Sequence, residues 1–330
     1  MTAAPAGRPR RRGGFAAFCR LVIVLVSAAV VAGVVAARSV HPAPQPAAAP
    51  AAPTPATPAA TATATAAPDP PRRSARATPR ARRPKALSTS ARKRLTRTLA
   101  GYLGGTGGRL AIAVRDLPTG AVFRYGTAQA FPTASIVKVD ILAALLLKAQ
   151  RAGRPLTADE RATAARMIQY SDNLAANALW DQIGGTAGLT AVNRRLGLRA
   201  TTAGPGGYWG VTMTGTADQV RLLWALVSRG SPLNARSRRY ALELMGSVTP
   251  AQRWGISAGA AGGDAVALKN GWLPRVPDGG TWVINSIGRI RGGGRDFLIA
   301  VLSDHNVTMA GGIARVEQVT RLVTKALGHT

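Results

Sequence analysis

Strand-like segments occur at the two ends of the region 87–330, and helical patterns fill the stretch between them. The segments 109–116 and 121–126, joined by the turn LPTG, are typical of a hairpin. Three more strand-like segments follow near the C-terminus, at 264–272, 281–290 and 296–304. Strands divided in this way predict one sheet formed by both ends of the domain, with the helical stretch packed beside it. We therefore expect an α/β (α+β) fold class with a cleft between the sheet edge and the helical block.

Helical periodicity accounts for most of the remaining folded region. Ser88 or Ser90 can cap a first helix, which ends at the segment GGTGG. Thr157, with Glu160 three residues later, forms a capping box in front of another helix. The further helices that we expect span 134–152, 157–169, 174–183, 187–195, 216–229, 235–246 and 309–327.

The first part of the chain, residues 1–38, has the layout of an export signal. The basic segment RPRRR precedes the apolar run 21–37, which is long enough to span a bilayer and also suits a cleaved signal peptide. Signal peptide and uncleaved membrane anchor are equal alternatives, and either one exports the remainder of the chain. Cys19 precedes the apolar run, whereas a lipoprotein signal needs its cysteine just after the run, so we expect no lipidation of this type.

Residues 39–86 consist almost wholly of Ala, Pro, Thr and Arg. Such a segment has too little apolar surface to form a core, so we predict a disordered basic linker in front of a folded domain at 87–330. Its prolines favour extended conformations that reach far from a membrane. The basic half of the linker is either simply solvated or touches anionic cell-wall polymers.

The charge balance is strongly basic, with 43 Lys and Arg against 14 Asp and Glu. Such a balance can indicate a polyanionic partner. The arginines are spread along the chain, however, and no nucleic-acid-binding motif occurs, so we expect no nucleic acid partner. The single cysteine excludes an internal disulfide and a cysteine-based zinc site. We expect a monomer that uses neither a metal nor an organic cofactor.

Three short polar motifs occur in the order Ser135-Ile136-Val137-Lys138, Ser171-Asp172-Asn173 and Lys269-Asn270-Gly271. Each alone has a structural explanation, as a helix cap followed by a surface lysine, a second cap between helices, and a lysine at a strand end. The first pair also suits chemistry. A serine near a helix N-terminus lies where the helix dipole favours negative charge, and a lysine one turn further on can act as its base once its pKa is lowered.

These motifs resemble the S-x-x-K, S-D-N and K-T-G set of class A β-lactamases and penicillin-binding proteins. The segment MIQYSDNLAANAL is especially similar to the surroundings of the second motif in that family. The resemblance covers about 87–330. It implies a five-stranded antiparallel sheet flanked by helices plus a mostly helical subdomain, a β-lactamase/transpeptidase-like fold. It also implies acyl transfer to a serine, with a β-lactam or a peptidoglycan-like amide as the small-molecule substrate.

The resemblance further assigns roles to individual residues. Ser135 would be the nucleophile, Lys138 its base, and Ser171 a proton-transfer group. The substrate-binding residues would be Asn173, Lys269, Asn270, Gly271 and Trp272, the last through its backbone N–H.

Two of these assignments have a physical reason. A cation at Lys269 would attract a substrate carboxylate and bias Lys138 toward its neutral form. The backbone N–H groups of Ser135 and Trp272 would form an oxyanion hole. Asn173 would hold Lys138 and a substrate amide, whereas we expect Asp172 to be structural.

The sequence departs from the family at two places. Asn270 stands where the family usually has Thr or Ser, which removes a hydroxyl used to bind carboxylate. No Asp or Glu occurs from 182 to 217, where the family has the Glu that activates the deacylating water. Tyr208 is the titratable side chain of the loop in this region, and we expect it to contribute little as a substitute for the missing base. Acylation is then expected to proceed while deacylation is slow.

The leading interpretation is an exported serine hydrolase, a β-lactamase of altered specificity. A peptidoglycan DD-peptidase (penicillin-binding protein) and an esterase or amidase are alternatives of the same class. A non-catalytic module that binds the cell wall is the alternative of another class. Trp209 and Trp272 either line the cleft or fill the core, with the cleft favoured for Trp272, and Asn285 is expected to be structural.

Overall fold

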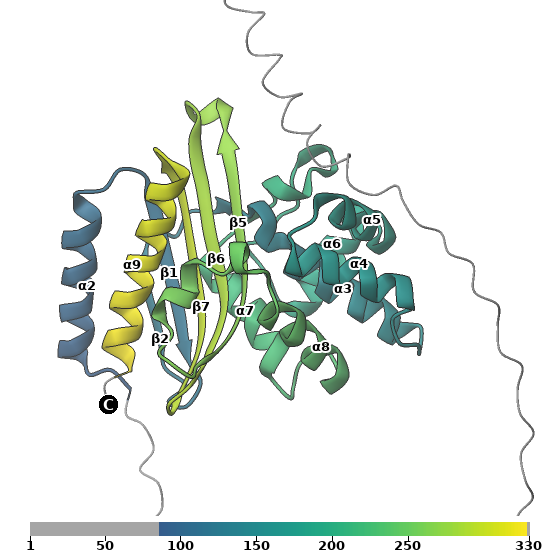
Figure 1. Ribbon diagram of the computed structural model, residues 1–330, viewed down its shortest axis with the longest axis horizontal. Helices are drawn as coiled ribbons and strands as arrows, with labels where there is room; N and C mark the ends of the chain where they lie inside the picture. Colours follow the sequence, from purple (N-terminus) through teal and green to yellow (C-terminus); the bar gives the residue numbers. More distant parts are fainter. Residues whose placement is uncertain (1–85, 329–330) are drawn as a thin grey trace, which may run out of the picture. The chain divides into compact units, whose positions relative to one another are not determined.

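The computed structural model describes residues 86–328 (Figure 1). The expected export signal, the linker up to residue 85 and Cys19 lie outside the described residues. Within residues 86–328, no helix combines the length and the apolar composition that crossing a bilayer requires.

Five strands form one antiparallel sheet in the order β2-β1-β7-β6-β5. They are β1 (Arg109–Asp116), β2 (Val122–Gly126), β5 (Ala265–Arg275), β6 (Thr281–Gly292) and β7 (Arg295–Asn306). All of β1 pairs with β7, so the N-terminal hairpin and the C-terminal strands meet inside the sheet. The prediction that both ends of the domain build a single sheet is confirmed, and β5 lies at one edge.

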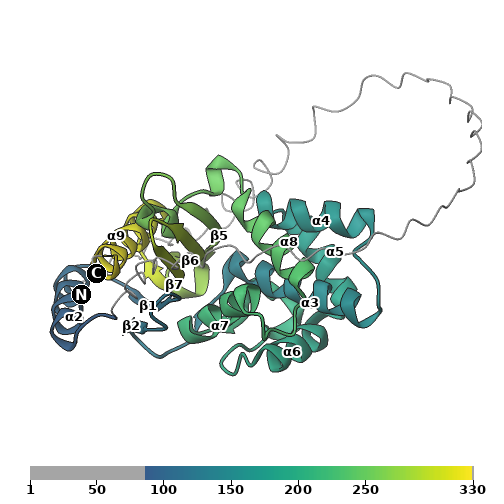
Figure 2. The same ribbon diagram turned by 90° about the horizontal axis from the view of Figure 1, so that it is seen from below.

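Two helices, α2 (Thr89–Gly104) and α9 (Met309–Leu327), lie side by side on one face of the sheet (Figures 1 and 2). The Ser88 hydroxyl caps α2 by accepting a hydrogen bond from the N–H of Ala91. Buried residues such as Leu99 join the sheet residues of this face in one apolar cluster. The first and last helices of the domain therefore complete the same layer.

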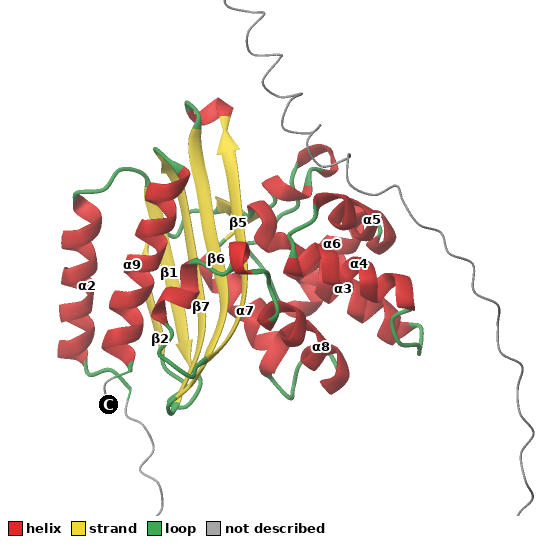
Figure 3. Ribbon diagram, in the orientation of Figure 1, coloured by secondary structure: helices red, strands yellow, loops and turns green. Residues whose placement is uncertain are grey.

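A helical subdomain lies on the opposite side of the sheet (Figure 3). It contains α3 (Lys138–Arg151), α4 (Ala158–Gln169), α5 (Asn173–Ile183), α6 (Gly185–Leu196), α7 (Thr216–Val227) and α8 (Ala235–Gly246). Helix α3 is buried along most of its length, and its charged residues Lys138 and Asp140 are buried with its apolar ones. In β1, Ile112 belongs to the cluster beneath α2 while Ala111 and Ala113 belong to that of the helical subdomain. Burial on both faces explains why β1 reads as a near-continuous apolar run.

The segment before α3 differs from the sequence expectation. A helix was expected from residue 134, but residues Ala134–Val137 form a separate 3₁₀ turn, η1, and the α-helix begins at Lys138. Two further strands, β3 (Phe131–Pro132) and β4 (Met213–Thr214), pair with each other in front of this turn. Their pairing brings the loop before α7 against the segment that carries the first motif.

Candidate active site

Ser135 lies on the turn η1 rather than in the first turn of α3. The preceding residue, Ala134, has a φ of +47°, a conformation that persists in a non-glycine residue only when its surroundings hold it. Asn285 of β6 is one such restraint, because its side-chain amide donates a hydrogen bond of 3.0 Å to the carbonyl oxygen of Thr133. Asn285 thus has the structural role that we expected, and it ties the turn that presents Ser135 to the sheet.

Lys138 is fully buried, and its ammonium group is held by the junction between α4 and α5. Its Nζ donates to the carbonyl oxygen of Ser171 at 2.6 Å, to Oδ1 of Asn173 at 2.7 Å and to Oγ of Ser171 at 3.2 Å. Among the described residues, its hydrogen bonds do not include one to Ser135. Burial lowers the pKa of Lys138 to about 7, although the charge of Asp172 partly opposes this shift. A large fraction of Lys138 is therefore neutral near pH 7 and can accept a proton.

Ser171 occupies the junction between α4 and α5 with a φ of +58°. Its Oγ lies 3.2 Å from Nζ of Lys138 and 2.9 Å from Nζ of Lys269. A hydroxyl both donates and accepts, so this oxygen can pass a proton between its two neighbours. Asp172 caps α5 by accepting a hydrogen bond of 3.0 Å from the N–H of Ala175, which supports the structural role expected for it.

Lys269 lies on β5 and is 1% exposed. Besides Oγ of Ser171, its Nζ contacts the carbonyl oxygen of Asn270 at 2.9 Å. Burial, followed by the charge of Lys138, lowers the pKa of Lys269 well below its ordinary value. Two buried amines and one hydroxyl thus form a continuous polar chain that contains no carboxylate.

Gly271 allows β5 to approach the turn η1 closely. A Cβ at this position would lie 2.8 Å from the backbone nitrogen of Ser135 and 2.9 Å from that of Ile136. Both distances are shorter than a carbon atom tolerates, so only glycine fits here without a shift of the backbone. The strand that carries the third motif is therefore packed directly against the backbone of the first.

We expected the side chains of Asn270 and Trp272 to face the substrate, but both make contacts elsewhere. The Asn270 amide donates to the carbonyl oxygens of Gln252 at 2.8 Å and Trp254 at 3.0 Å. The Trp272 ring packs beside Trp254, with ring centroids 6.1 Å apart, next to the apolar cluster beneath α2 and α9. Side chains alternate along a strand, so both point away from Lys269. These contacts favour structural roles for the Asn270 amide and the Trp272 ring over the substrate contacts expected from the sequence.

Trp209, which the sequence left undecided between cleft and core, is part of the site. Nζ of Lys138 lies 4.9 Å from the centroid of its ring. The indole N–H donates a hydrogen bond of 2.8 Å to Oδ1 of Asn177 on α5, which fixes the ring. An indole face attracts an ammonium group but cannot accept its proton. Tyr208, the neighbouring residue, is 74% exposed.

The sheet, the flanking helices and the Ser–Lys–Ser–Lys arrangement define the class of protein: a serine hydrolase fold of the β-lactamase and penicillin-binding type. No group of three or more His, Cys, Asp or Glu side chains that could hold a metal ion occurs within residues 86–328. The chain belongs to the beta-lactamase enzyme family, whose model matches residues 91–163 and 153–327.

Similarities to individual proteins, in sequence and in structure, are consistent with membership of this family. Over 223 residues the chain is 33% identical to the Mycobacterium tuberculosis protein named "Putative lipoprotein LppW", covering 65% of this chain and 69% of that protein. The acyl-enzyme complex of a PBP-A mutant with penicillin G has the same fold, with a TM-score of 0.62 and 22% identity over 75% of this chain and 99% of that one. A variant of the last common ancestor of Gram-negative bacteria β-lactamase class A gives a TM-score of 0.60 and 26% identity over 72% of this chain and 99% of that one.

Proposed function

We propose that this protein is an exported serine enzyme in which a β-lactam or a related peptidoglycan amide acylates Ser135, and that the acyl group is released slowly. The observation that carries the proposal is the position of the Ser171 hydroxyl, 3.2 Å and 2.9 Å from the amines of Lys138 and Lys269. A helix cap and two surface lysines would need neither burial nor this contact. Membership of the beta-lactamase enzyme family supports the same reaction class.

In the acylation step, neutral Lys138 accepts the hydroxyl proton of Ser135 while the serine oxygen bonds to the amide carbon. The negative charge that develops on the carbonyl oxygen is stabilised by the backbone N–H groups of Ser135 and Trp272. The carbon–nitrogen bond then breaks as Ser171 gives its proton to the nitrogen and recovers one from Lys138. The products are an ester at Ser135, an amine, and Lys138 in its neutral form again. The missing Lys138–Ser135 hydrogen bond is compatible with this step, since such contacts often tighten when substrate binds.

Substrate recognition would use the remaining polar groups around the hydrogen-bonded chain of Lys138, Ser171 and Lys269. The exposed side chain of Asn173 accepts from Lys138 and leaves its own N–H₂ group free to meet a substrate carbonyl. Lys269 is too deeply buried to reach far, so it would act on a substrate carboxylate through the Ser171 hydroxyl that it contacts. The Asn270 amide is not part of this proposal, because it binds a neighbouring loop.

Among residues 86–328, no carboxylate pairs with the Lys138 amine to act as a general base for release of the acyl group. The groups around Nζ of Lys138 are Ser171, Asn173 and the ring of Trp209, none of which is a carboxylate. The sequence has no Asp or Glu from 182 to 217. Activation of the attacking water then depends on Lys138 alone, which supports fast acylation followed by slow hydrolysis.

Intact-mass measurement over time, with the full-length protein and benzylpenicillin, tests this function. We expect one adduct of the mass of the penicillin that accumulates and persists, that Ser135→Ala abolishes, and that Ser257→Ala, a substitution of a serine outside the site, leaves unchanged. Rapid and sustained turnover of a chromogenic cephalosporin would contradict the slow release. The absence of any adduct would favour the non-catalytic cell-wall module.

A peptidoglycan DD-peptidase is the second candidate, and the lack of a carboxylate at Lys138 favours it. Such an enzyme would be acylated by a peptide ending in D-Ala-D-Ala as well as by penicillin. Release of D-alanine from this peptide, measured beside cephalosporin hydrolysis, separates the peptidase from a β-lactamase. An esterase would instead hydrolyse simple esters and release no D-alanine.

The proposal places the enzyme outside the cytoplasm, either held by the segment 21–37 or secreted after cleavage. The layout of residues 1–38 supports it, as does similarity to a protein whose name describes a lipoprotein. The position of Cys19 before the apolar run argues for a protein anchor or a cleaved signal rather than a lipid. Protease accessibility of the domain in intact cells is the matching measurement.

A further inference from the structure

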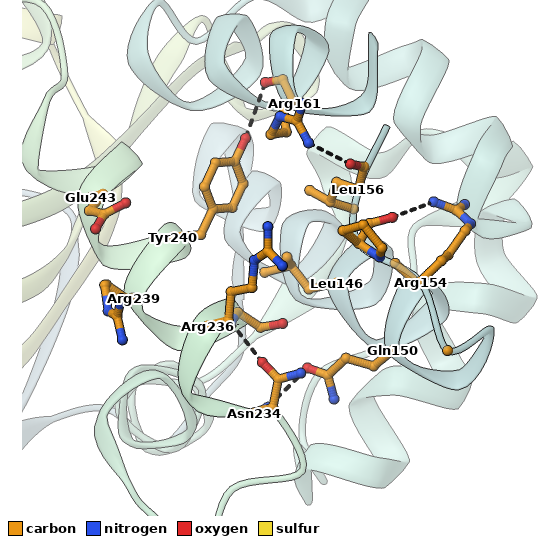
Figure 4. A pocket seen from close by; sticks show the side chains of 14 residues that line it. Leu146, Gln150, Arg154, Leu156, Arg161, Asn234, Arg236, Arg239, Tyr240 and Glu243 are labelled. Carbon is orange, nitrogen blue, oxygen red and sulfur yellow. Dashed lines mark hydrogen bonds between the residues drawn. The ribbon is translucent and has the colours of Figure 1, made fainter. Parts of the chain in front are cut away.

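A cavity of about 590 Å³ opens in the helical subdomain, away from the proposed catalytic residues (Figure 4). Its walls come from the C-terminal half of α3, the segment that leads into α4, α4 itself and α8. Leu146, Leu156 and Tyr240 contribute apolar surface. Four arginines also line it, namely Arg154, Arg161, Arg236 and Arg239.

Hydrogen bonds between the walls fix the shape of this cavity. The Gln150 side chain donates to the carbonyl oxygen of Pro232 at 3.1 Å and accepts from the N–H of Asn234 at 3.0 Å, which joins α3 to the start of α8. The Tyr240 hydroxyl donates to the carbonyl oxygen of Arg161 at 3.1 Å, which joins α8 to α4. The cavity is thus a preformed feature of the subdomain, and hydrogen bonds join its walls on two sides.

The arginines differ in how their charges are balanced. Arg154 forms two hydrogen bonds with the Glu160 carboxylate, at 2.7 and 2.8 Å. Within residues 86–328, Arg161, Arg236 and Arg239 form no ion pair. Figure 4 shows the Arg236 side chain reaching from α8 into the space between Tyr240 and Leu146.

Exposed arginines without an acidic partner also occur elsewhere in the described domain, as at Arg194 and Arg195 on α6. The distinctive feature of the cavity is that three such arginines line one concave site. The lining of the cavity contains one carboxylate, that of Glu243, against three arginines without an acidic partner. Cations gathered in one concave site repel one another, and an anion held between them relieves the repulsion.

We propose that this cavity binds a ligand that carries a phosphate group. Planar guanidinium groups match phosphate oxygens in bidentate fashion, and two excess positive charges suit a phosphate monoester better than a single carboxylate. The volume lies in the range of small-molecule sites, so the phosphate would belong to a larger molecule whose remainder contacts Leu146 and Tyr240. The site is independent of the reaction at Ser135.

Calorimetric titration of the full-length protein at physiological salt tests the proposal with three probes: inorganic phosphate, glycerol 3-phosphate as a monoester and glycerophosphocholine as a diester. We expect saturable binding with the monoester or the diester as the tighter ligand, which identifies the kind of phosphate recognised. The double substitution Arg236→Gln/Arg239→Gln should weaken binding about tenfold or more, because it removes two charge-assisted contacts.

The matched control is Arg194→Gln/Arg195→Gln, which removes the same charge from two exposed arginines at the end of α6 and should leave binding unchanged. Glu243→Gln should tighten binding, a gain that a damaged protein cannot produce. Arg236→Lys, which keeps the positive charge but not the planar guanidinium group, should weaken binding. Equal weakening by both arginine pairs, no effect of Arg236→Gln/Arg239→Gln, or no saturable binding of any probe would overturn the proposal.

Discussion

The protonation state of Lys138 controls the proposed chemistry. Since its pKa is lowered to about 7 by burial, the ammonium form prevails below that pH and cannot accept the Ser135 proton. The acylation rate should therefore rise with pH to a half-maximal value near 7 and level off above it. Measurement of acylation by benzylpenicillin from acidic to alkaline pH checks this profile. Lys138→Arg should give no acylation at any pH because a guanidinium stays charged, and a flat native profile would be inconsistent with Lys138 as the base.

Asp140, two residues further along α3, is buried without a hydrogen-bond partner for either carboxyl oxygen among residues 86–328. Burial raises the pKa of Asp140 from 3.8 to about 8. The folded state therefore keeps a proton that the unfolded chain loses above about pH 4, and this contribution makes stability fall as the pH rises toward 8.

Asp140→Asn should remove that pH dependence and stabilise the protein by roughly 1–4 kcal/mol at pH 7. Urea unfolding of the native and variant proteins at pH 4 and pH 7 measures the difference. Parallel changes in the two proteins would show that Asp140 is ionised in the folded state.

Individual site residues could be predicted to different degrees. The Ser171 hydroxyl contacts both Lys138 and Lys269. The first two motifs fall at helix boundaries that the pattern also predicts, whereas Lys269, which was expected at a strand end, lies in the middle of β5. The position of Trp209 could not be predicted, since it depends on a hydrogen bond to Asn177 across two elements. The orientation of Asn270 could have been found, because alternation along β5 already places it opposite Lys269.

At the scale of elements, the site depends on the close backbone contact between β5 and η1. Gly271→Ala would place a methyl carbon 2.8 Å from the backbone nitrogen of Ser135, which either displaces the strand or moves the nucleophile. We expect a loss of about 1–3 kcal/mol in unfolding free energy together with a lower acylation rate. Gly262→Ala is the matched control, because a Cβ there meets nothing within 4 Å. Thermal unfolding and acylation kinetics measure both effects, and wild-type kinetics in Gly271→Ala would refute the role of this contact.

Most helices and strands could be predicted from local sequence signals, and the elements that were missed share one cause. The capping box at Thr157 and Glu160 is present, and the hairpin of β1 and β2 forms as expected. The turn η1 and the short strands β3 and β4 were missed. They are fixed by distant partners, such as the hydrogen bond of 2.8 Å from the N–H of Thr133 to the carbonyl oxygen of Thr212. Periodicity within a short window contains no information on such partners.

At the scale of the whole molecule, the domain is predicted to function without its N-terminal extension. A chain that begins at Ala86 retains α2, whose Arg92 donates a hydrogen bond of 3.0 Å to the carbonyl oxygen of Val122. We expect this chain to be acylated like the full-length protein and to lose only its export. A chain that begins at Gly105 lacks α2 and the buried Leu99, and should be markedly less stable. Acylation kinetics and thermal unfolding of both chains test this, and failure of the longer one to fold would extend the domain toward the N-terminus.

The pairing of β1 with β7 has a consequence for the order of events during synthesis. Arg109 and Asp304 are partners in adjacent strands although they are 195 residues apart in sequence. The hairpin of β1 and β2 emerges early, but its inner edge has no partner until the last strand has been made. High contact order of this kind slows folding. A nascent chain therefore carries Ser135 and Lys138 well before it carries Lys269, and the proposed chemistry would begin only when the C-terminal strands close the sheet.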